Sequence, residues 1–310
     1  MKEPLVSVYT CVFNMADRID RVFRSMKSQT YGNIEHVIVD DGSTDGVDKL
    51  LAQYKQEVSF PVVLIRKKNG GKHTATNAAW DNCHGEYLVQ LDADDELLPD
   101  AIRKLVSLTE NVPEAERNNY WCYVGRCRNQ FSDSMIGSAY PSEINSLSSS
   151  EAALLDKKLG GEKIGLLRAS SLNGIRFPEP AGVKFVPEGV VWEQLNLKYR
   201  TWYSNEIVRV YYVDEGYGLS HQKMSRQTMN NKVWSCKWQL ENRRNYETKG
   251  LRCLVPYCVG YHLTTKEYRD NNPYLIWSSF PVHLLLILLF IPSFIVHFPL
   301  SAALSRVDKR

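Results

Sequence analysis

The sequence lacks the features that would assign it to several common protein classes. None of its seven cysteines forms a closely spaced pair with histidine nearby, which argues against a zinc site. They suggest no disulfide framework either, so we expect reduced thiols in a cytosolic setting. Internal repeats and low-complexity linkers are also missing, and MKEPLVSVYT at the start has no apolar stretch long enough for a signal peptide. With 310 residues, the chain suits one large domain or one domain with an appendage.

Charged residues are missing from one long segment, residues 271–305, whose centre reads FPVHLLLILLFIPSFIVHFPL. A helix of roughly 20 apolar residues can cross a bilayer. A break at Pro292, however, would leave residues 280–291 to span only about 18 Å at a rise of 1.5 Å per residue. We therefore expect a membrane-associated segment at about 275–304. The break favours a segment that re-enters the membrane or lies in its plane over a straight crossing, which stays open. A buried core helix is the alternative.

The charge is unevenly distributed along the chain. Residues 1–220 hold 25 basic and 30 acidic residues, whereas residues 221–310 hold 13 and 5. A basic tail can bind nucleic acid or an anionic membrane surface. Because the uncharged segment follows in the same tail, we expect a membrane partner and no nucleic acid. The body would then lie in the cytosol, at the cytoplasmic face of the membrane.

Strand-like and helix-like patterns alternate over the first 125 residues, and helices cover both faces of such a sheet. Buried strands are predicted at 5–12, 35–40, 61–66, 87–92 and 120–125. The fold class is therefore α/β, with a mainly parallel sheet.

The pattern loosens after residue 126. Ser148 and Glu151 have capping-box spacing, residues 190–200 suggest a helix, and residues 207–213 suggest a strand. We predict one α/β domain over residues 1–220, with halves at 1–125 and 126–220. A helical, membrane-binding tail would occupy residues 221–310.

Polar clusters follow the first four predicted strands. These are Thr10 with Asn14, DDGSTD at 40–45, NGGKHTATN at 69–77, and DADD at 92–95. Each cluster alone could be an ordinary turn or helix cap. In an open parallel sheet, however, ligands bind outside the carboxyl ends of the strands. Four clusters at one edge therefore predict a binding site.

The DADD run places three carboxylates within four positions, where like charges repel and raise each other's pKa. If the strand continues, Asp92 and Asp94 share one side of it, and a hard divalent cation could neutralise them. Mg²⁺ takes one or two carboxylates and fills its other positions with water and phosphate oxygens. We therefore expect a phosphorylated ligand, with Lys72 beside two glycines available to it. The alternative is a solvated loop in which Asp95 caps the next helix.

The segments LVSVYTCVFN, VIVDDGSTD and NGGKHTATNAAWDNCHGEYLVQLDADDELLPDAI occur in this order. Over about residues 4–105, and more loosely to about 215, the chain resembles family 2 glycosyltransferases of the bacterial surface-polysaccharide type. The resemblance implies a GT-A fold, a Rossmann-like, mainly parallel mixed sheet flanked by helices. It implies inverting transfer of a hexosyl or N-acetylhexosaminyl group from a nucleotide-sugar, usually a UDP-sugar, with Mn²⁺ or Mg²⁺. The acceptor would be a saccharide hydroxyl, and the membrane-associated tail favours a lipid-linked saccharide.

The resemblance also assigns roles on the donor side. Thr10 and Asn14 would flank the nucleoside, and Asp40, with Asp41, would accept a hydrogen bond from the uracil.

Further residues would meet the rest of the donor. Lys72 would lie near the base or the diphosphate, with Asn77 in the same donor-binding segment. Asp92 would contact the ribose and help to hold the metal, which Asp94 binds. His221, in the loop DEGYGLSH, could approach the metal or the diphosphate; the alternative is a plain surface histidine.

The general base of the family commonly belongs to a Glu-Asp pair, and here that pair is altered. In GIRFPEPAGVKFVPEGVVWEQL, Glu188 precedes Gly189 and Glu193 precedes Gln194. We favour Glu188, in a Pro-Glu-Gly bend after an apolar strand, over Glu193, on a helix. The altered pair leaves open a non-catalytic nucleotide-sugar-binding homologue. A sugar-phosphate nucleotidylyltransferase is less favoured, because CVFNMADR lacks the glycine-rich loop of those enzymes.

Overall fold

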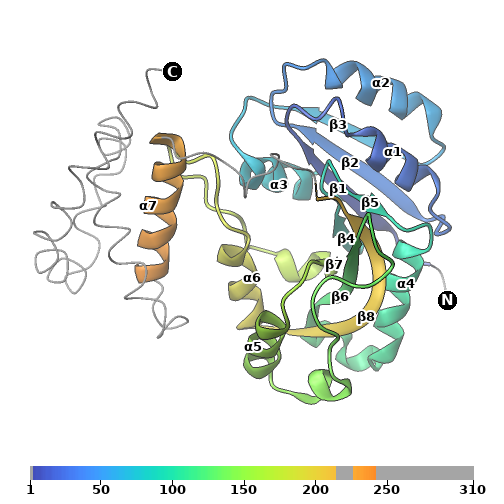
Figure 1. Cartoon of the computed structure of the whole chain (residues 1–310), viewed down its shortest axis with the longest axis vertical. Helices are drawn as coiled ribbons and strands as arrows, with labels where there is room; N and C mark the ends of the chain where they lie inside the picture. Colours follow the sequence, from blue (N-terminus) through green and yellow to red (C-terminus); the bar gives the residue numbers. More distant parts are fainter. Residues whose placement is uncertain (1–2, 214–225, 242–310) are drawn as a thin grey trace, which may run out of the picture. The chain divides into compact units, whose positions relative to one another are not determined.

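Eight strands form one mixed sheet in the order β3-β2-β1-β4-β7-β6-β8-β5 (Figure 1). The computed structural model describes residues 3–213 and 226–241. The strands are β1 (Val6–Val12), β2 (Ile34–Asp40), β3 (Val62–Arg66), β4 (Tyr87–Gln90), β5 (Glu96–Leu97), β6 (Tyr120–Asn129), β7 (Lys163–Arg168) and β8 (Arg200–Tyr211). The α-helices are α1 (Asp20–Lys27), α2 (Val47–Glu57), α3 (Lys72–Trp80), α4 (Ala101–Ser107), α5 (Ser149–Leu159), α6 (Gly189–Asn196) and α7 (Arg226–Glu241).

The first four strands run parallel, as the alternating pattern predicts. β1 lies between β2 and β4, and β2 pairs with β3 on its other side. Nearly every residue of β1 and all of β2 are buried, which explains their continuous runs of β-branched residues. The chain moves outward from β1 to β3 and then returns to β4 on the other side of β1. This reversal is the switch point at which open α/β sheets bind ligands.

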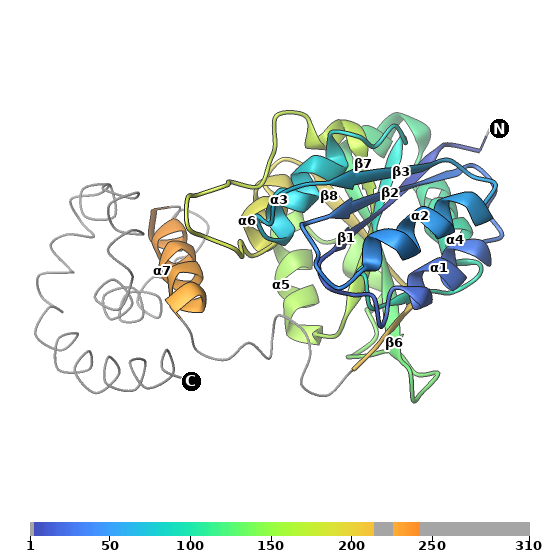
Figure 2. The same cartoon turned by 90° about the horizontal axis from the view of Figure 1, so that it is seen from above.

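Helices cover both faces of the sheet. Right-handed crossovers place α1 and α2 on one face, and the reversal before β4 places α3 on the other, as Figure 2 shows. The core on the first face joins α1 to α4, with Val22, Met26, Ile102 and Leu105 buried in one cluster. On the second face, Trp80 of α3 packs against α6. The predicted α/β class with both faces covered is confirmed.

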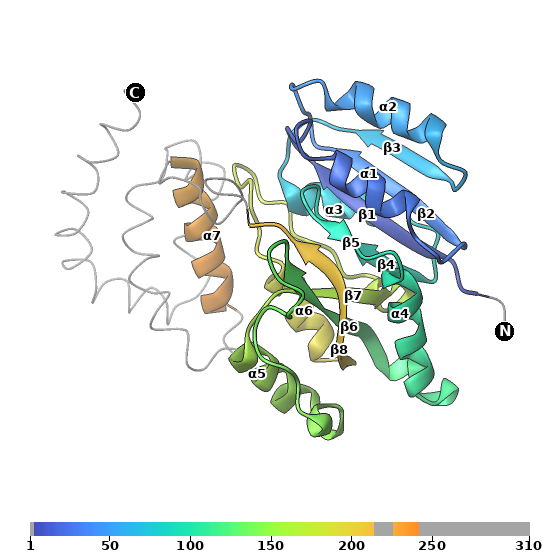
Figure 3. The same cartoon turned by 45° about the vertical axis from the view of Figure 1, so that its right-hand side comes forward.

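The second half of the sheet differs from the prediction. β7 was not anticipated; it lies between β4 and β6 and is antiparallel to both. β5 is also antiparallel to its partner β8 (Figure 3). The predicted strand at 207–213 is the second half of β8, and the predicted strand at 87–92 already ends at Gln90. The capping box of α5 is present, because Ser148 accepts from the backbone of Glu151.

The contacts divide the chain into two compact units. The first comprises Met1–Gly70, Thr74–Phe177 and Gly189–Val213, and the second comprises Gly71–His73, Pro178–Glu188 and Asp214–Arg310. The predicted boundary at residue 220 stays a prediction. His221 and the segment at about 275–304 lie outside the described residues. Within the described ranges, no helix has both the length and the apolarity to cross a membrane.

Candidate functional site

Hydrogen bonds join the loops after β1 and β2 at the carboxyl edge of the sheet. The backbone N–H of Asn14 donates to Ser43 Oγ over 2.9 Å, and the N–H of Thr44 donates back to Asn14 Oδ1 over 2.9 Å. The N–H of Ala16 donates to Asp45 Oδ2 over 2.7 Å. Asn14 has a φ of 53°, a left-handed conformation that asparagine adopts more readily than most residues. Asn14 therefore helps to hold the two loops together.

Asp40 ends β2 and is almost fully buried. Its Oδ1 accepts the backbone N–H of Ser43 over 2.8 Å, and its Oδ2 lies 3.4 Å from Arg66 Nε. Arg66 Nη2 also donates to the carbonyl of Ser43 over 2.9 Å. The turn after β2 is therefore held by a carboxylate and by an arginine at the end of β3.

Asp41 is buried beside a lysine that sequence reasoning missed. Its Oδ1 accepts from Lys67 Nζ over 2.8 Å and from the Gly70 N–H over 2.9 Å. Lys67 Nζ also donates to Thr74 Oγ1 over 2.7 Å. Gly42 follows Asp41 with a φ of 81°, which suits glycine, and a Cβ there would lie 2.9 Å from the Asn69 nitrogen. The loop after β3 is thus fastened to the loop after β2 by a charged pair.

Thr10 lies beneath these loops rather than on the surface. It is fully buried, and its Oγ1 is 3.1 Å from His36 Nε2, while His36 Nδ1 is 3.0 Å from Tyr54 Oη. Burial lowers the pKa of His36 to about 3, so the ring is neutral at physiological pH. Contact of Thr10 with a nucleoside stays a prediction, and it would require the hydroxyl to exchange its present partner.

The acidic run occupies a turn, not the end of a strand. The Asp95 N–H donates to the Asp92 carbonyl over 3.2 Å, and the chain then enters β5. The expectation that Asp92 and Asp94 share one side of a strand is therefore wrong. Asp92 and Asp94 are half-buried and Asp95 is buried. Asp95 does not cap the next helix either, because Asp100 holds the N-cap position of α4.

Arg209 on β8 supplies positive charge to this turn, and sequence reasoning missed it. Its Nη1 lies 3.3 Å from Asp95 Oδ2 and 3.6 Å from Asp92 Oδ2. Its Nη2 lies 3.7 Å from Glu162 Oε2, and its Nε donates to Cys127 Sγ over 3.2 Å. The signal in the sequence is an arginine within the apolar run IVRVYYV. Such a residue needs partners that compensate its buried charge.

Burial raises the pKa of Asp95 to about 7, against the opposing effects of Arg209 and of the Tyr212 N–H, which donates to Asp95 Oδ1 over 3.1 Å. One guanidinium thus faces the carboxylates of Asp92, Asp95 and Glu162. Negative charge exceeds positive charge at this turn, which suits a hard divalent cation bound by oxygen ligands. Within the described ranges, no group of three or more His, Cys, Asp or Glu could hold a metal by itself.

A second set of contacts holds the outer side of the turn. Arg21 Nη1 donates to the Asp94 carbonyl over 3.1 Å, and its guanidinium lies 3.9 Å from the centre of the Tyr212 ring. Tyr212 Oη donates to Glu96 Oε2 over 2.9 Å. The end of β8 and helix α1 therefore restrain the acidic turn from two directions.

Asn77 and Glu193, both predicted site residues, lie on α3 and α6. The Asn77 side chain donates to the Phe177 carbonyl over 2.9 Å and accepts the Phe177 N–H over 3.0 Å, so it fastens the chain after β7 to α3. Glu193 is half-buried and follows Trp192, whose ring centre lies 6.1 Å from that of Trp80. Their predicted roles stay predictions.

In the second unit, the structure brings Lys72 and Glu188 together. Lys72 Nζ lies 3.1 Å from Glu188 Oε1. No strand precedes Glu188, since residues 183–187 have no regular structure, so that part of the argument for Glu188 is wrong. In the same unit a side chain on Gly71 would bring a Cβ to 2.0 Å from the Lys184 carbonyl oxygen, so only glycine fits there.

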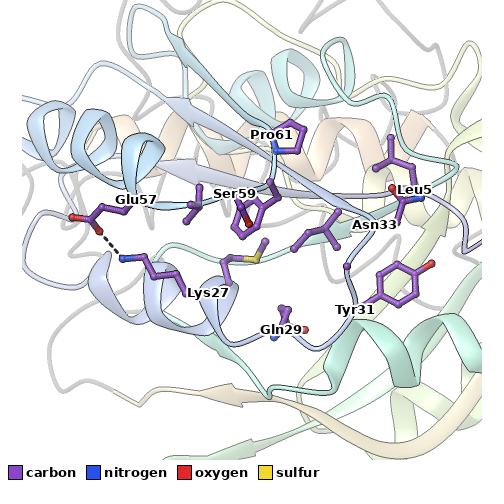
Figure 4. A pocket seen from close by; sticks show the side chains of 13 residues that line it. Leu5, Lys27, Gln29, Tyr31, Asn33, Glu57, Ser59 and Pro61 are labelled. Carbon is purple, nitrogen blue, oxygen red and sulfur yellow. Dashed lines mark hydrogen bonds and ion pairs between the residues drawn. The ribbon is translucent and has the colours of Figure 1, made fainter.

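A cavity of about 560 Å³ lies at the opposite edge of the sheet. Its lining includes Leu5, Asn33 and Pro61, which precede β1, β2 and β3, and the Lys27–Glu57 ion pair lies at its side (Figure 4). Open α/β sheets bind ligands at the other edge, so the strand-end loops remain the candidate site.

The comparisons with known proteins agree with this geometry. Residues 7–127 match the model of glycosyl transferase family 2. This segment of the chain, residues 7–127, is therefore similar to family 2 glycosyltransferases. The match ends within β6, so it covers the loops with Asp40, Asp41 and the acidic turn, but not Arg209.

Two curated relatives of this segment have names that refer to polysaccharide synthesis. The chain is 41% identical to the chondroitin synthase of Escherichia coli over 100 residues, which are 32% of this chain and 14% of that protein. It is 36% identical over 102 residues to the Bacillus subtilis (strain 168) protein TuaG, a glycosyltransferase named for teichuronic acid biosynthesis. These residues are 33% of this chain and 40% of TuaG. The chain thus spans less than half the length of these relatives.

Solved structures of low sequence identity share the fold of this chain, the GT-A fold. S. aureus TarS 1–349 in complex with UDP-GlcNAc superposes with a TM-score of 0.58 at 17% identity, over 93% of this chain and 81% of that one. The mannosyltransferase PcManGT from Pyrobaculum calidifontis, in complex with GDP-Man and Mn²⁺, superposes with a TM-score of 0.51 at 15% identity. The superposition covers 100% of this chain and 80% of that one.

Proposed function

We propose that this protein transfers a sugar from a nucleotide diphosphate donor to a hydroxyl of a saccharide acceptor, with inversion at the anomeric carbon. The observation that carries the proposal is the acidic turn of Asp92, Asp94 and Asp95 beside β1, with Asp40 and Asp41 on the other side of the same strand. Adjacent strands are about 4.8 Å apart. The two acidic groups therefore lie roughly 10 Å apart at the switch point, a separation that suits a nucleoside with its diphosphate.

The donor is a UDP-sugar in this proposal. Asp40 and Asp41 would face the uracil, and the loop of Asn14 would flank the nucleoside. The relatives support a nucleotide-sugar, since TarS was solved with UDP-GlcNAc and PcManGT with GDP-Man. Whether the transferred group is a hexose or an N-acetylhexosamine depends on the acceptor half, outside the family match.

Asp92 and Asp94 would hold Mn²⁺ or Mg²⁺, and the excess negative charge around Arg209 fits a cation at this turn. When bound, such an ion stabilises the charge that develops on a diphosphate leaving group. Arg209, Tyr212 and Arg21 hold the turn in place through their contacts.

Glu188 is our first candidate for the base that takes the proton of the acceptor hydroxyl, and Glu193 is the second. A correctly placed carboxylate contributes about 10²–10⁴ in rate. Lys72 restrains the orientation of the Glu188 carboxylate. If neither carboxylate acts as a base, the second candidate function is a non-catalytic nucleotide-sugar-binding protein. The altered Glu-Asp pair supports this alternative.

A donor panel tests the proposal. Membranes containing the protein are incubated with UDP-sugars, with GDP-mannose as the comparison, with and without Mn²⁺, and hydrolysis or transfer is measured. We expect turnover of one UDP-sugar that depends on the metal and a product of inverted configuration by NMR. Absence of metal-dependent nucleotide binding by calorimetry would contradict the proposal.

Two single variants separate the enzyme from the non-catalytic protein. Glu188→Gln and Glu193→Gln should both retain donor binding, and the variant that removes the base should lower transfer by about 10²-fold or more. If both retain transfer, the base assignment is wrong. If the unmodified chain binds the donor but transfers nothing to any saccharide, the non-catalytic function is favoured.

We further propose that the acceptor is a lipid-linked saccharide and that the basic, apolar tail holds the protein at the cytoplasmic face of the membrane. The uncharged residues 271–305 and the basic excess of residues 221–310 support this location. Fractionation of cells tests it: the full chain should sediment with membranes, and a chain ending at residue 270 should shift toward the soluble fraction.

A further inference from the structure

We infer that Arg209 is a positioning residue for donor binding: its guanidinium orients Asp92 in the acidic turn so that this carboxylate can bind the metal and nucleotide. The inference rests on the proposed function and extends it to a residue on β8, beyond the family match. Arg209 would touch neither donor nor metal in this role, and it would act through the carboxylates that it contacts.

Arg209 is buried, and its contacts are concentrated on the turn. About 5% of its surface is exposed, and Asp95, its nearest acidic partner, is only 1% exposed. The same Nη1 lies 3.3 Å from Asp95 Oδ2 and 3.6 Å from Asp92 Oδ2. One nitrogen therefore links a buried carboxylate to a half-exposed one. The buried member fixes the guanidinium, and the guanidinium restrains the exposed member.

The strand that carries Arg209 is itself registered against the turn. Leu97 of β5 pairs with Arg209, and Glu96 pairs with Val210. The N–H of Tyr212, three residues along the chain, donates to the other oxygen of Asp95 over 3.1 Å. The side chain of Arg209 and the backbone just beyond β8 thus hold both oxygens of Asp95. Arg209 also contacts Asp92, whose Oδ1 lies 3.2 Å from the Gln90 amide.

A buried guanidinium is costly to desolvate, and charged partners or hydrogen bonds must compensate that cost. Nε faces the Cys127 thiol, which burial keeps protonated by raising its pKa to about 11. The compensating charge therefore comes from the acidic turn and from Glu162. Groups that orient metal ligands in this way typically change metal affinity by about 10–100-fold when mutated.

A structural role alone is the competing explanation, because Arg209 also neutralises buried Asp95. Arg209→Met would leave that carboxylate unpaired and could fail to fold. The double variant R209M/D95N removes both buried charges and keeps Asp92 and Asp94. Arg209→Lys keeps the charge but cannot contact two carboxylates with the same planar geometry.

Arg126 offers a matched control. It is also a fully buried arginine of the sheet, and its Nη2 donates to the carbonyls of Ile136, Ser138 and Gly160, not to the acidic turn. Arg126→Met therefore removes a buried guanidinium of the same size without touching Asp92.

The experiment measures UDP binding by calorimetry on the full chain, with and without Mn²⁺, together with the melting temperature. For R209M/D95N we expect a melting temperature near that of the unmodified protein and Mn²⁺-dependent UDP affinity lowered by about 10–100-fold. The UDP affinity of Arg209→Lys should lie between that of R209M/D95N and that of the unmodified protein. Arg126→Met, measured well below its melting temperature, should keep its UDP affinity within about threefold of the unmodified value, less than the smallest loss expected for an orienting group.

Three outcomes are distinguishable. A double variant that folds and binds UDP with Mn²⁺ as the unmodified chain does overturns the inference and leaves the proposed function intact. Equal losses of affinity in Arg126→Met and R209M/D95N also overturn it, because the effect would then be general destabilisation. An unmodified chain that binds no UDP with Mn²⁺ contradicts the proposed function, and the inference fails with it.

Discussion

Acidification should destabilise the protein through His36, a buried histidine that is held neutral. The ring is fully buried between β1 and α2, where it contacts the hydroxyls of Thr10 and Tyr54, and its neighbours in the sheet are Val8 and Val62. In the described part of the chain, no acidic side chain forms an ion pair with it. Burial therefore lowers its pKa from 6.5 to about 3.

The sign follows from which state binds the proton. Below pH 6.5 the unfolded chain protonates His36 while the folded chain does not, so the stabilisation is complete above that pH and is lost as the pH falls toward 3. At about pH 5 the gap of one and a half pH units corresponds to about 2 kcal/mol of unfolding free energy.

Urea unfolding of the unmodified protein and of His36→Gln, at about pH 8 and about pH 5, measures this contribution. The variant keeps a polar side chain but cannot titrate. The effect of the substitution itself on the free energy of unfolding is the same at both pH values, so it cancels when the two free energies are subtracted. We expect the unmodified protein to lose about 2 kcal/mol more than the variant between the two conditions. A difference below about 0.5 kcal/mol would show that the buried ring accepts a proton in the folded state.

Four further substitutions test the loops and one helix. Lys67→Met leaves the buried Asp41 without its ammonium partner, so we expect a loss of about 1–3 kcal/mol by urea unfolding and weaker UDP binding by calorimetry; unchanged UDP binding would remove Asp41 from the donor site. Gly42→Ala places a Cβ 2.9 Å from a backbone nitrogen of the loop after β3, whereas Gly46→Ala, at a similar positive φ, meets nothing within 4 Å. The first should therefore lower the melting temperature more than the second, and equal losses would mean that conformational strain alone is measured. Ser148→Ala removes the capping box of α5 and should cost about 1 kcal/mol in urea unfolding; no loss would mean that α5 is held by packing alone.

The half of the sheet formed by β1 to β4 could be predicted because its signals are local. Continuous β-branched runs separated by helical spacing identify parallel strands covered on both faces, and Asp40 and Asp41 follow directly from the end of such a strand. The alternation of strand and helix patterns did not predict strands whose pairing partners are distant in the sequence. β7 joins the sheet beside β4 although some 70 residues separate their sequences, and no local pattern specifies that pairing.

The acidic turn shows the same limit within the site. Its composition predicts a need for positive charge, and we expected a divalent cation to supply it. The structure shows that Arg209 supplies part of it, from a strand more than a hundred residues away. In the sequence, Arg209 within the apolar run IVRVYYV indicates a need for a charged partner. That run does not identify the carboxylate that Arg209 contacts.

The position of β7 has a consequence for the exchange of segments between proteins of this fold. Because β7 hydrogen-bonds to β4 on one side and to β6 on the other, the segment matched by the family is closed by a strand that comes from outside it. A fragment cut at residue 127 would expose the unpaired backbone of β4, an open edge that invites aggregation. Chimeras that swap specificity should therefore keep β7 with the donor half and place their junctions in surface loops beyond it.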